Sequence, residues 1–467
     1  LPLPDVLGYA IGYAERGFEV PPRLAATVEG VAELFRAEWT SSAQVWLPAG
    51  APPRAGQRMT NPLLAATYRR LLAEAAAGGA GRDAQLSAAR DAWSDGFVAE
   101  AIAGFVADAE VLDTSGRRHR GLLSGDDLAG WRAPLEAPVS TRYRDWTVHK
   151  TGPWGQGPVF CQQLRLLEGF DLAAAGHGSA DWIHTIIECA KLAFADREAF
   201  YGDPAFVDVP LHALLDEGYA AERRRLVGER ASLELRPGRP GGAEPRLPPS
   251  VQAGIAATLV PGTGEPTVAA DPSEGDTCHV DVADRWGNVV AATPSGGWLQ
   301  SSPAIPGLGF CLTTRAQMFW LDERHPNGLA GGKRPRTTLT PTLARHDGGD
   351  LLAFGTPGGD TQDQWSLALF CAHVDTGLGL QEAIEAPGWS ISHFPSSFYP
   401  RRREPGRVTV EGRLDAGTLA ALRRRGHDVA VGGDWTQGRL CAVGRSPDGT
   451  LKAAADPRAA QGYAAGR

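Results

Sequence analysis

The sequence is poor in the features that mark several classes of protein. Its six cysteines are scattered over 467 residues without CxxC spacing, which implies separate thiols rather than a disulfide framework. No apolar run reaches the roughly 18 residues that a membrane span needs, so we expect no membrane association. No internal repeat is visible, which disfavours solenoids and propellers.

An excess of basic charge is also missing. The formal net charge is −8, whereas nucleic acids and anionic lipids select clustered Lys and Arg. A composition of 43% hydrophobic and 21% charged residues suits a globular protein with a buried core. We therefore expect a small-molecule partner and no nucleic acid.

The chain starts at Leu1 rather than at Met, and no signal peptide is visible. We expect Leu1 to be an internal residue of a longer precursor. The location is left open by the sequence, and the absence of a visible signal peptide favours the cytoplasm.

The hydrophobic pattern changes along the chain. Helical spacing predicts helices within residues 2–67, where Asn61 suits an N-cap and Pro62 the first helical position, and another helix near 93–105. Residues 182–204 are expected to form a long amphipathic helix that belongs to the core. Residues 229–276 are rich in Pro and Gly and read as a flexible connector. Alternating residues then predict a hairpin over 277–293 with a turn at 284–288, followed by more short strands and helices. The sequence thus predicts a mixed α/β (α+β) fold.

A threonine opens the first strand directly after the connector. A Thr hydroxyl needs a nearby base, and a Thr at a new chain terminus carries one in its own α-amine. The hydroxyl of Thr277 follows Glu274-Gly275-Asp276, so attack on the preceding carbonyl would give an ester that water hydrolyses. A Thr in this place is more often only a good strand former, and the pattern alone leaves both interpretations open.

The segment around Thr277 resembles the start of the small subunit of gamma-glutamyltranspeptidases, which has the form Thr, any residue, His, a short strand, Asp and Gly-Asn. Further blocks follow in the family's order over nearly the whole chain: GLLSGDDLAGW, GPWGQGPVFCQQLRLLEGFDL, IIECAKLAFADREAFYGDP, KRPRTTLTPTLA and FGTPGGD. The resemblance implies a four-layered αββα sandwich of the N-terminal-nucleophile hydrolase type and an acyl-enzyme mechanism without cofactor or metal.

The same resemblance implies self-cleavage between Asp276 and Thr277. Residues 1–276 would form the large-subunit portion and residues 277–467 the small subunit, intertwined in one catalytic domain. A homodimer of such processed heterodimers is one assembly that the family allows.

The resemblance also assigns roles to individual positions. Thr277 would be the nucleophile and, through its α-amine, the general base, and Ser295 would be the second hydroxyl that supports it. Without the resemblance, Ser295 reads as a turn serine. The remaining roles are the oxyanion-binding backbone of Gly358 and Gly359, and the hydroxyl pair of Thr337 and Thr338 that binds a substrate carboxylate.

Several neighbouring residues carry weaker signals. Cys278 would gain no free amine on cleavage, and FGTPGGD lacks the Lys-Ser/Thr of a phosphate loop, which leaves a nucleotide-binding enzyme as a minor alternative. His279 and Asp281 share a strand face, where hydrogen bonding is more common than a metal site with only two ligands. Four tryptophans could line a substrate pocket, although aromatic residues more often pack in the core: Trp286, Trp298, Trp320 and Trp365.

The resemblance weakens where a glutamyl group would be held. Gly297 stands where the family has Asn, and Thr313 to Met318 replace its Asn-Asn-Gln-Met-Asp-Asp stretch. The family's carboxylate-binding Arg would lie before Leu1, so Arg315 or Arg336 is expected to substitute.

The sequence therefore predicts an amide hydrolase or acyltransferase that keeps the catalytic apparatus and acts on another small amide, as do relatives that cleave oxamate or cephalosporin side chains. The alternatives are a true gamma-glutamyltranspeptidase or glutathione hydrolase, and a catalytically inactive binding relative.

Overall fold

The computed structural model describes residues 1–253, 277–458 and 462–466. The chain divides into two compact units: unit 1 contains residues 1–135 and 296–314, and unit 2 contains residues 136–253, 277–295 and the chain from Arg315 on. Both units therefore contain chain from before and after residue 276. No helix within the described ranges is long and apolar enough to cross a membrane.

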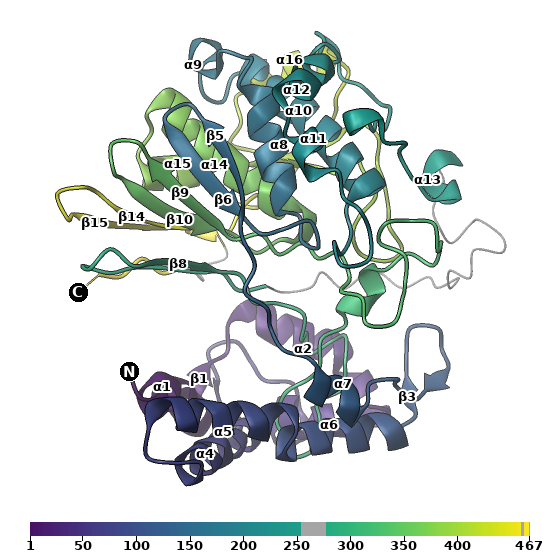
Figure 1. Ribbon diagram of the computed structural model, residues 1–467, viewed down its shortest axis with the longest axis vertical. Helices are drawn as coiled ribbons and strands as arrows, with labels where there is room; N and C mark the ends of the chain where they lie inside the picture. The colour runs from purple at the N-terminus through teal and green to yellow at the C-terminus, as the bar shows by residue number, and fades with distance from the viewer. Residues whose placement is uncertain (254–276, 459–461, 467) are drawn as a thin grey trace. The chain divides into compact units, whose positions relative to one another are not determined.

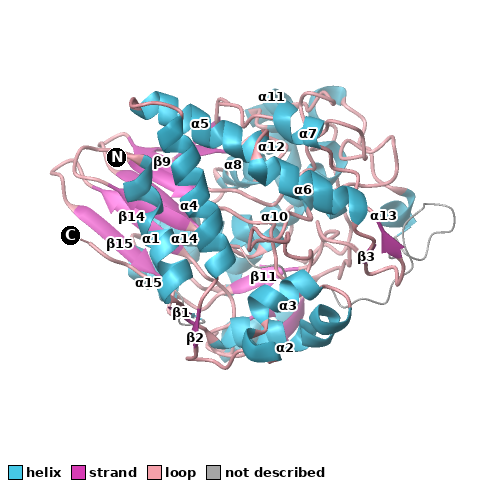
Figure 2. Cartoon of the chain, turned by 90° about the horizontal axis from the view of Figure 1, so that it is seen from below, coloured by secondary structure: helices cyan, strands magenta, loops and turns pink. Residues whose placement is uncertain are grey.

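Unit 1 is mainly helical (Figure 2). Its two short strand pairs are β1 with β2 and β3 with β4. The helix expected near 93–105 is interrupted, because α5 ends at Ser94 and α6 begins at Phe97. The elements of this unit are α1 Leu3–Arg16, β1 Phe18–Glu19, α2 Pro22–Ala37, α3 Thr40–Trp46, β2 Arg58–Met59, α4 Pro62–Ala77, α5 Arg82–Ser94, α6 Phe97–Asp108, β3 Val111–Leu112, β4 Arg118–His119 and α7 Gly125–Gly130.

The start of α4 confirms the predicted helix cap. Asn61 Oδ1 accepts a hydrogen bond of 3.1 Å from the backbone N–H of Leu64, and Pro62 occupies the first helical position. The same side chain donates from Nδ2 to the carbonyl of Gly309 at 2.7 Å. Asn61 therefore caps a helix and ties it to the segment 296–314 of the same unit.

Unit 2 is built on an antiparallel six-stranded sheet with the order β15-β14-β10-β9-β6-β5. The pair β6 with β9 joins a strand from before residue 276 to one from after it, with His149 opposite Leu343. The strands of this sheet are β5 Val139–Tyr143, β6 Trp146–Lys150, β9 Thr342–His346, β10 Leu351–Gly355, β14 Cys441–Arg445 and β15 Leu451–Ala455.

Two further layers cover this sheet (Figure 1). Helices α8 and α14 pack on one face, and the hairpin of β7 (Val280–Ala283) and β8 (Val289–Ala292) lies against β10 and β14 on the other. A small sheet of β11, β12 and β13 completes the unit. Its remaining elements are α8 Gly157–Leu167, α9 Leu172–Ala175, α10 Ala180–Phe200, α11 Leu211–Leu214, α12 Glu217–Arg224, α13 Pro249–Ala253, α14 Gln362–Thr376, α15 Leu380–Glu385, β11 Trp389–Ile391, β12 Arg407–Val410, α16 Ala416–Arg424 and β13 Asp428–Val431.

Helix α10 confirms the expected core helix. It is buried on nearly all sides, and the buried residues include the charged Glu188, Arg197 and Glu198. These charged side chains have partners inside the protein. The helix ends at Phe200, shortly before Gly202 and Pro204 as the sequence indicated.

The first part of the expected connector is bound to the core. Gly238 donates its backbone N–H to Asp196 at 2.7 Å, and Ala231 donates to the carbonyl of Arg425 at 2.8 Å. Residues 254–276, which include the expected cleavage residue Asp276, lie outside the described part of the chain.

We predict that Asn61→Ala lowers the free energy of unfolding by about 1–2 kcal/mol, because it removes a helix cap and a buried hydrogen bond. Asn61→Asp keeps the cap acceptor but places a carboxylate oxygen against the carbonyl of Gly309 in a buried site, so its loss should be larger at neutral pH. Thermal unfolding of the three proteins checks this order, and equal losses for both variants would contradict it.

Candidate functional site

Thr277 and Ser295 face each other at the open end of the β7–β8 hairpin. The two residues form an isolated antiparallel bridge, and their hydroxyl oxygens lie 2.8 Å apart. Thr277 is 9% exposed. The structure therefore brings together the two hydroxyls that the sequence singled out, and the predicted hairpin is confirmed.

The buried face of this hairpin continues with polar side chains. Nδ1 of His279 lies 2.8 Å from the hydroxyl oxygen of Thr293, and Nε2 of the same ring lies 2.9 Å from Oδ1 of Asp281. The side chains of His279 and Asp281 are 0% and 1% exposed. Burial raises the pKa of Asp281, and the hydrogen bond from His279 acts in the opposite direction. These are hydrogen-bonding roles, as the sequence favoured.

The hairpin lies against β10 at a glycine. A Cβ atom on Gly355 would come within 2.4 Å of the His279 ring, so only glycine leaves room for the imidazole. Three residues further on, Gly358 and Gly359 have φ angles of +131° and +59°. Trp365 packs where a side chain on Gly358 would be, and Phe398 does the same for Gly359. This turn leads directly into α14.

A carboxylate follows the glycine pair. Asp360 accepts hydrogen bonds from the backbone and the hydroxyl of Ser397 at 2.7 and 2.6 Å, and it forms an ion pair with Arg197 of α10. A free negative charge here would oppose a developing oxyanion. The guanidinium of Arg197 compensates that charge and fixes the first residue after the turn.

Arg315 and Thr338 lie beside the same turn. Arg315 Nη1 donates to the hydroxyl of Thr338 at 3.4 Å, and its guanidinium lies 5.7 Å from the ring centre of Phe398, the ring that packs on Gly359. Burial lowers the pKa of Arg315 to about 10. Thr337, also buried, uses its backbone N–H to bind the carbonyl of Trp154 at 2.8 Å.

Comparison with known proteins decides the family. The family model described as gamma-glutamyltranspeptidase matches residues 1–466. The chain belongs to the gamma-glutamyltranspeptidase family.

Relatives of this family match most of the chain. An acylase ACY 1 proenzyme of Pseudomonas sp. (strain SE83) is 31% identical over 98% of this chain and 70% of its own length. An oxamate amidohydrolase proenzyme of Klebsiella pneumoniae is 31% identical over 99% of this chain and 76% of its own length. The solved structure of LmbA2991HD is 55% identical, with a TM-score of 0.91, and the match covers 100% of this chain and 79% of that one.

These matches confirm the expected family, mixed fold and enzyme class. The protein is an amide hydrolase or acyltransferase of the gamma-glutamyltranspeptidase type, and both of these relatives are named as proenzymes.

Arg336 is engaged differently from Arg315 in this family member. Its Nη2 donates to Glu198 at 2.8 Å, its Nη1 donates to the carbonyl of Arg197 at 3.0 Å, and both Arg336 and Glu198 are buried. Burial alone would raise the pKa of Glu198, but attraction to Arg336 and Arg197 outweighs it and lowers the pKa to about 2. Arg336 therefore serves an internal ion pair.

Reasoning from the sequence missed Arg197, Glu198 and Asp360. The residues were visible in the family-like blocks ADREAFYGDP and FGTPGGD. For Arg197 and Glu198 the available signal was charge inside an apolar helical pattern.

The four tryptophans that were expected to line a pocket or to pack differ in how far they are buried. Trp365 packs beside Gly358, whereas Trp286 is 76% exposed at the hairpin turn. Trp320 is buried and donates to Glu198 at 3.0 Å. In unit 1, Trp298 is buried, and a Cβ on Gly297 would lie 3.0 Å from the carbonyl of Cys311, which leaves little room for the family's Asn.

One group of side chains in unit 2 has the composition of a metal site: His184, Glu188 and His427. The two imidazoles instead bind each other at 2.8 Å, and Glu188 accepts from Lys191 at 2.6 Å. Cations next to the carboxylate disfavour a bound metal ion. This cluster is best explained as an internal hydrogen-bond network.

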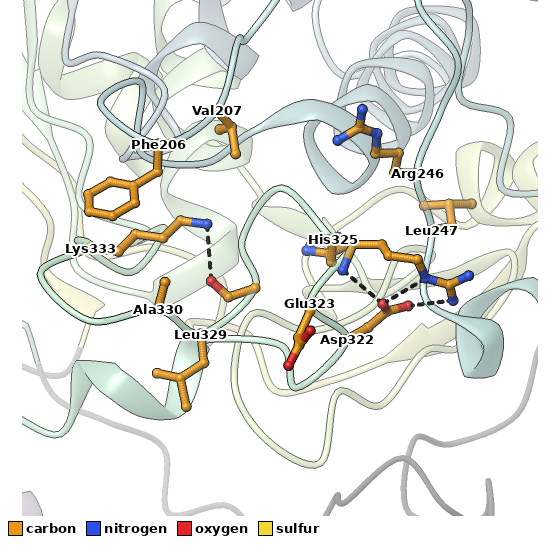
Figure 3. Close-up of a pocket in the computed structure, with 12 residues that line it drawn as sticks. Phe206, Val207, Arg246, Leu247, Asp322, Glu323, His325, Leu329, Ala330 and Lys333 are labelled. Atoms are coloured by element: carbon orange, nitrogen blue, oxygen red, sulfur yellow. Dashed lines mark hydrogen bonds and ion pairs between the residues drawn. The ribbon is translucent and has the colours of Figure 1, made fainter.

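A cavity of about 740 Å³ lies elsewhere in unit 2 (Figure 3). Phe206 and Leu247 are among its apolar lining residues, and Lys333 hydrogen-bonds within it to the carbonyl of Gly328 at 3.0 Å. Neither Thr277 nor any other candidate catalytic residue lines it. The cavity is therefore separate from the candidate active site.

We predict that Glu198→Gln destabilises the protein by roughly 3–5 kcal/mol at neutral pH, because it leaves buried arginine charge uncompensated. The lowered pKa of Glu198 means that its stabilising effect is complete above about pH 4.5 and is lost as the pH falls toward 2. The difference in Tm between wild type and variant should therefore shrink below pH 4.5.

Glu323→Gln is the control, since Glu323 is exposed. A constant difference in Tm from pH 7 to pH 3 would contradict the assignment of the ion pair.

Proposed function

We propose that Thr277 is the nucleophile of this family member and that the precursor is cleaved between Asp276 and Thr277. The observation that carries the proposal is the 2.8 Å contact between the Thr277 and Ser295 hydroxyls at the start of the hairpin. A threonine hydroxyl needs such a neighbour to orient it and to share its proton.

Self-cleavage then follows from one attack. The Thr277 oxygen bonds to the carbonyl carbon of Asp276, the peptide C–N bond breaks, and the nitrogen takes up a proton to become the α-amine. Water hydrolyses the resulting ester, which releases the Asp276 carboxylate and restores the hydroxyl. The pairing of β6 with β9 supports continued association of the two pieces, because one sheet contains strands of both.

In turnover the same hydroxyl attacks the substrate amide. The α-amine accepts the hydroxyl proton and passes it to the departing amine, which leaves the acyl group on Thr277. The backbone N–H groups of the Gly358-Gly359 turn are proposed to bind the oxyanion, and glycine allows the required close approach. Water, or a second amine, then removes the acyl group.

The acyl group that this site favours is small and carries a carboxylate close to the scissile carbonyl. Arg315 and Thr338 supply a cation and a hydroxyl beside the glycine turn, and both groups bind carboxylates. The 31% identical oxamate amidohydrolase is named for a substrate of that chemistry. We therefore propose an oxamate-like amide rather than a gamma-glutamyl compound as the acyl donor.

The first test is a denaturing gel of purified wild type beside Thr277→Ala. The wild type should split into two bands, with the smaller fragment starting at Thr277 by N-terminal sequencing. The variant should remain one band. A split variant, or an uncleaved folded wild type, would show that the nucleophile is misassigned.

The second test concerns the acyl pocket. Arg315→Gln should lower kcat/KM for oxamate by about 100-fold, because it removes a charged hydrogen-bond donor from a desolvated site. Hydrolysis of an uncharged amide such as acetamide should change far less. Efficient turnover of gamma-glutamyl-p-nitroanilide with none of oxamate would overturn the proposed substrate class and favour a true gamma-glutamyltranspeptidase.

A further inference from the structure

The end of the hairpin that carries Thr277 lies beyond the paired residues of β7 and β8. Thr277 pairs with Ser295 as an isolated bridge, and their hydroxyl oxygens lie 2.8 Å apart. At the adjacent pair, Cys278 donates to the carbonyl of Pro294 at 3.2 Å, and Pro294 itself has no N–H to donate. Side-chain pairs therefore contribute to the contacts across this end of the hairpin.

His279 and Thr293 form the next cross-strand pair on the same face. The register that places Val280 opposite Ala292 places His279 opposite Thr293 and Thr277 opposite Ser295. Alternation along the strands turns these side chains toward β10 and β14, while Val280 is 51% exposed on the other face. Two polar side-chain pairs thus lie next to each other beneath the backbone.

Asp281 fixes the orientation of the imidazole. As a carboxylate it accepts from His279 Nε2–H, which leaves Nδ1 of the neutral ring as the acceptor for the hydroxyl proton of Thr293. The ring itself is held against Gly355. Asp281 and Thr293 therefore each bind one ring nitrogen of His279, and each of the two hydrogen bonds has a defined direction.

We propose that His279 is a positioning residue that acts through Thr293 to keep the Thr277 hydroxyl on Ser295 after self-cleavage. The proposal rests on the assignment of Thr277 as nucleophile. Before cleavage the chain holds Thr277 from both sides. Afterwards Thr277 is a chain terminus, and the neighbouring side-chain pair limits its movement.

Packing alone does not explain why His279, Asp281 and Thr293 are polar. Burying an imidazole and a carboxylate costs free energy that apolar side chains of similar volume would not cost. A polar set with one fixed hydrogen-bond arrangement does define register and orientation, and a slip of one residue would turn Thr277 to the exposed face.

The experiment uses a nearly isosteric pair at one position. Thr293→Val removes the hydroxyl and Thr293→Ser keeps it. Val290→Thr is the control, because it makes the reverse change on the exposed face of the same hairpin, where Val290 is 53% exposed. The measurements are kcat and KM of the processed enzyme, the half-time of self-cleavage, and Tm.

Thr293→Val should lower kcat about tenfold with little change in KM, and it should slow self-cleavage less than turnover, because the uncleaved chain still holds Thr277. Thr293→Ser should retain most of the wild-type kcat, and Val290→Thr should match wild type. Asp281→Asn gives a second route: it weakens the orientation of His279 and should also lower kcat at unchanged KM.

A wild-type kcat in both Thr293→Val and Asp281→Asn would overturn the proposal, as would a loss of kcat in Thr293→Ser equal to that in Thr293→Val. If Thr293→Val does not fold, Asp281→Asn decides alone. Failure of the nucleophile assignment is seen separately, since wild type would then not be cleaved at Thr277.

Discussion

The ion pair between Glu198 and Arg336 is the contact on which much of unit 2 depends. Helix α10 lies inside the protein, so each of its charged side chains must find a partner there or destabilise the fold. Glu198 binds Arg336, which immediately precedes the Thr337-Thr338 pair. Arg197 binds Asp360, which immediately follows the glycine turn. One buried helix thereby fixes two separate segments of the candidate site.

These pairs also set the electrostatics around the turn. The hydrogen bonds and the ion pair at Asp360 compensate its negative charge, which would otherwise oppose an oxyanion at the neighbouring backbone. Arg315 adds positive charge beside Thr338. Negative charge that develops on the substrate during acyl transfer would therefore be stabilised from both the backbone and the side chains, and an acyl group with its own carboxylate would share in this attraction.

The sequence predicted the features that arise from neighbouring residues. Alternation around Thr277, the turn before Asn288 and the cap at Asn61 are local, and the structure has all three. The pairing of charges on α10 is not local: Glu198 and Arg336 are 138 residues apart in the chain, so helical spacing could indicate a core helix but not the partners of its charged side chains. For the same reason Arg315 and Arg336 looked equivalent as ligands until their partners were known.

The catalytic and recognition parts of the proposed site differ in what they require from the sequence. The nucleophile needs a strand end with two facing hydroxyls, and the oxyanion site needs a glycine turn, so backbone geometry determines both. Recognition depends on side chains such as Arg315, which can be exchanged without moving that backbone. A change of acyl donor with unchanged acyl-transfer chemistry therefore requires only side-chain substitutions and no rearrangement of the backbone.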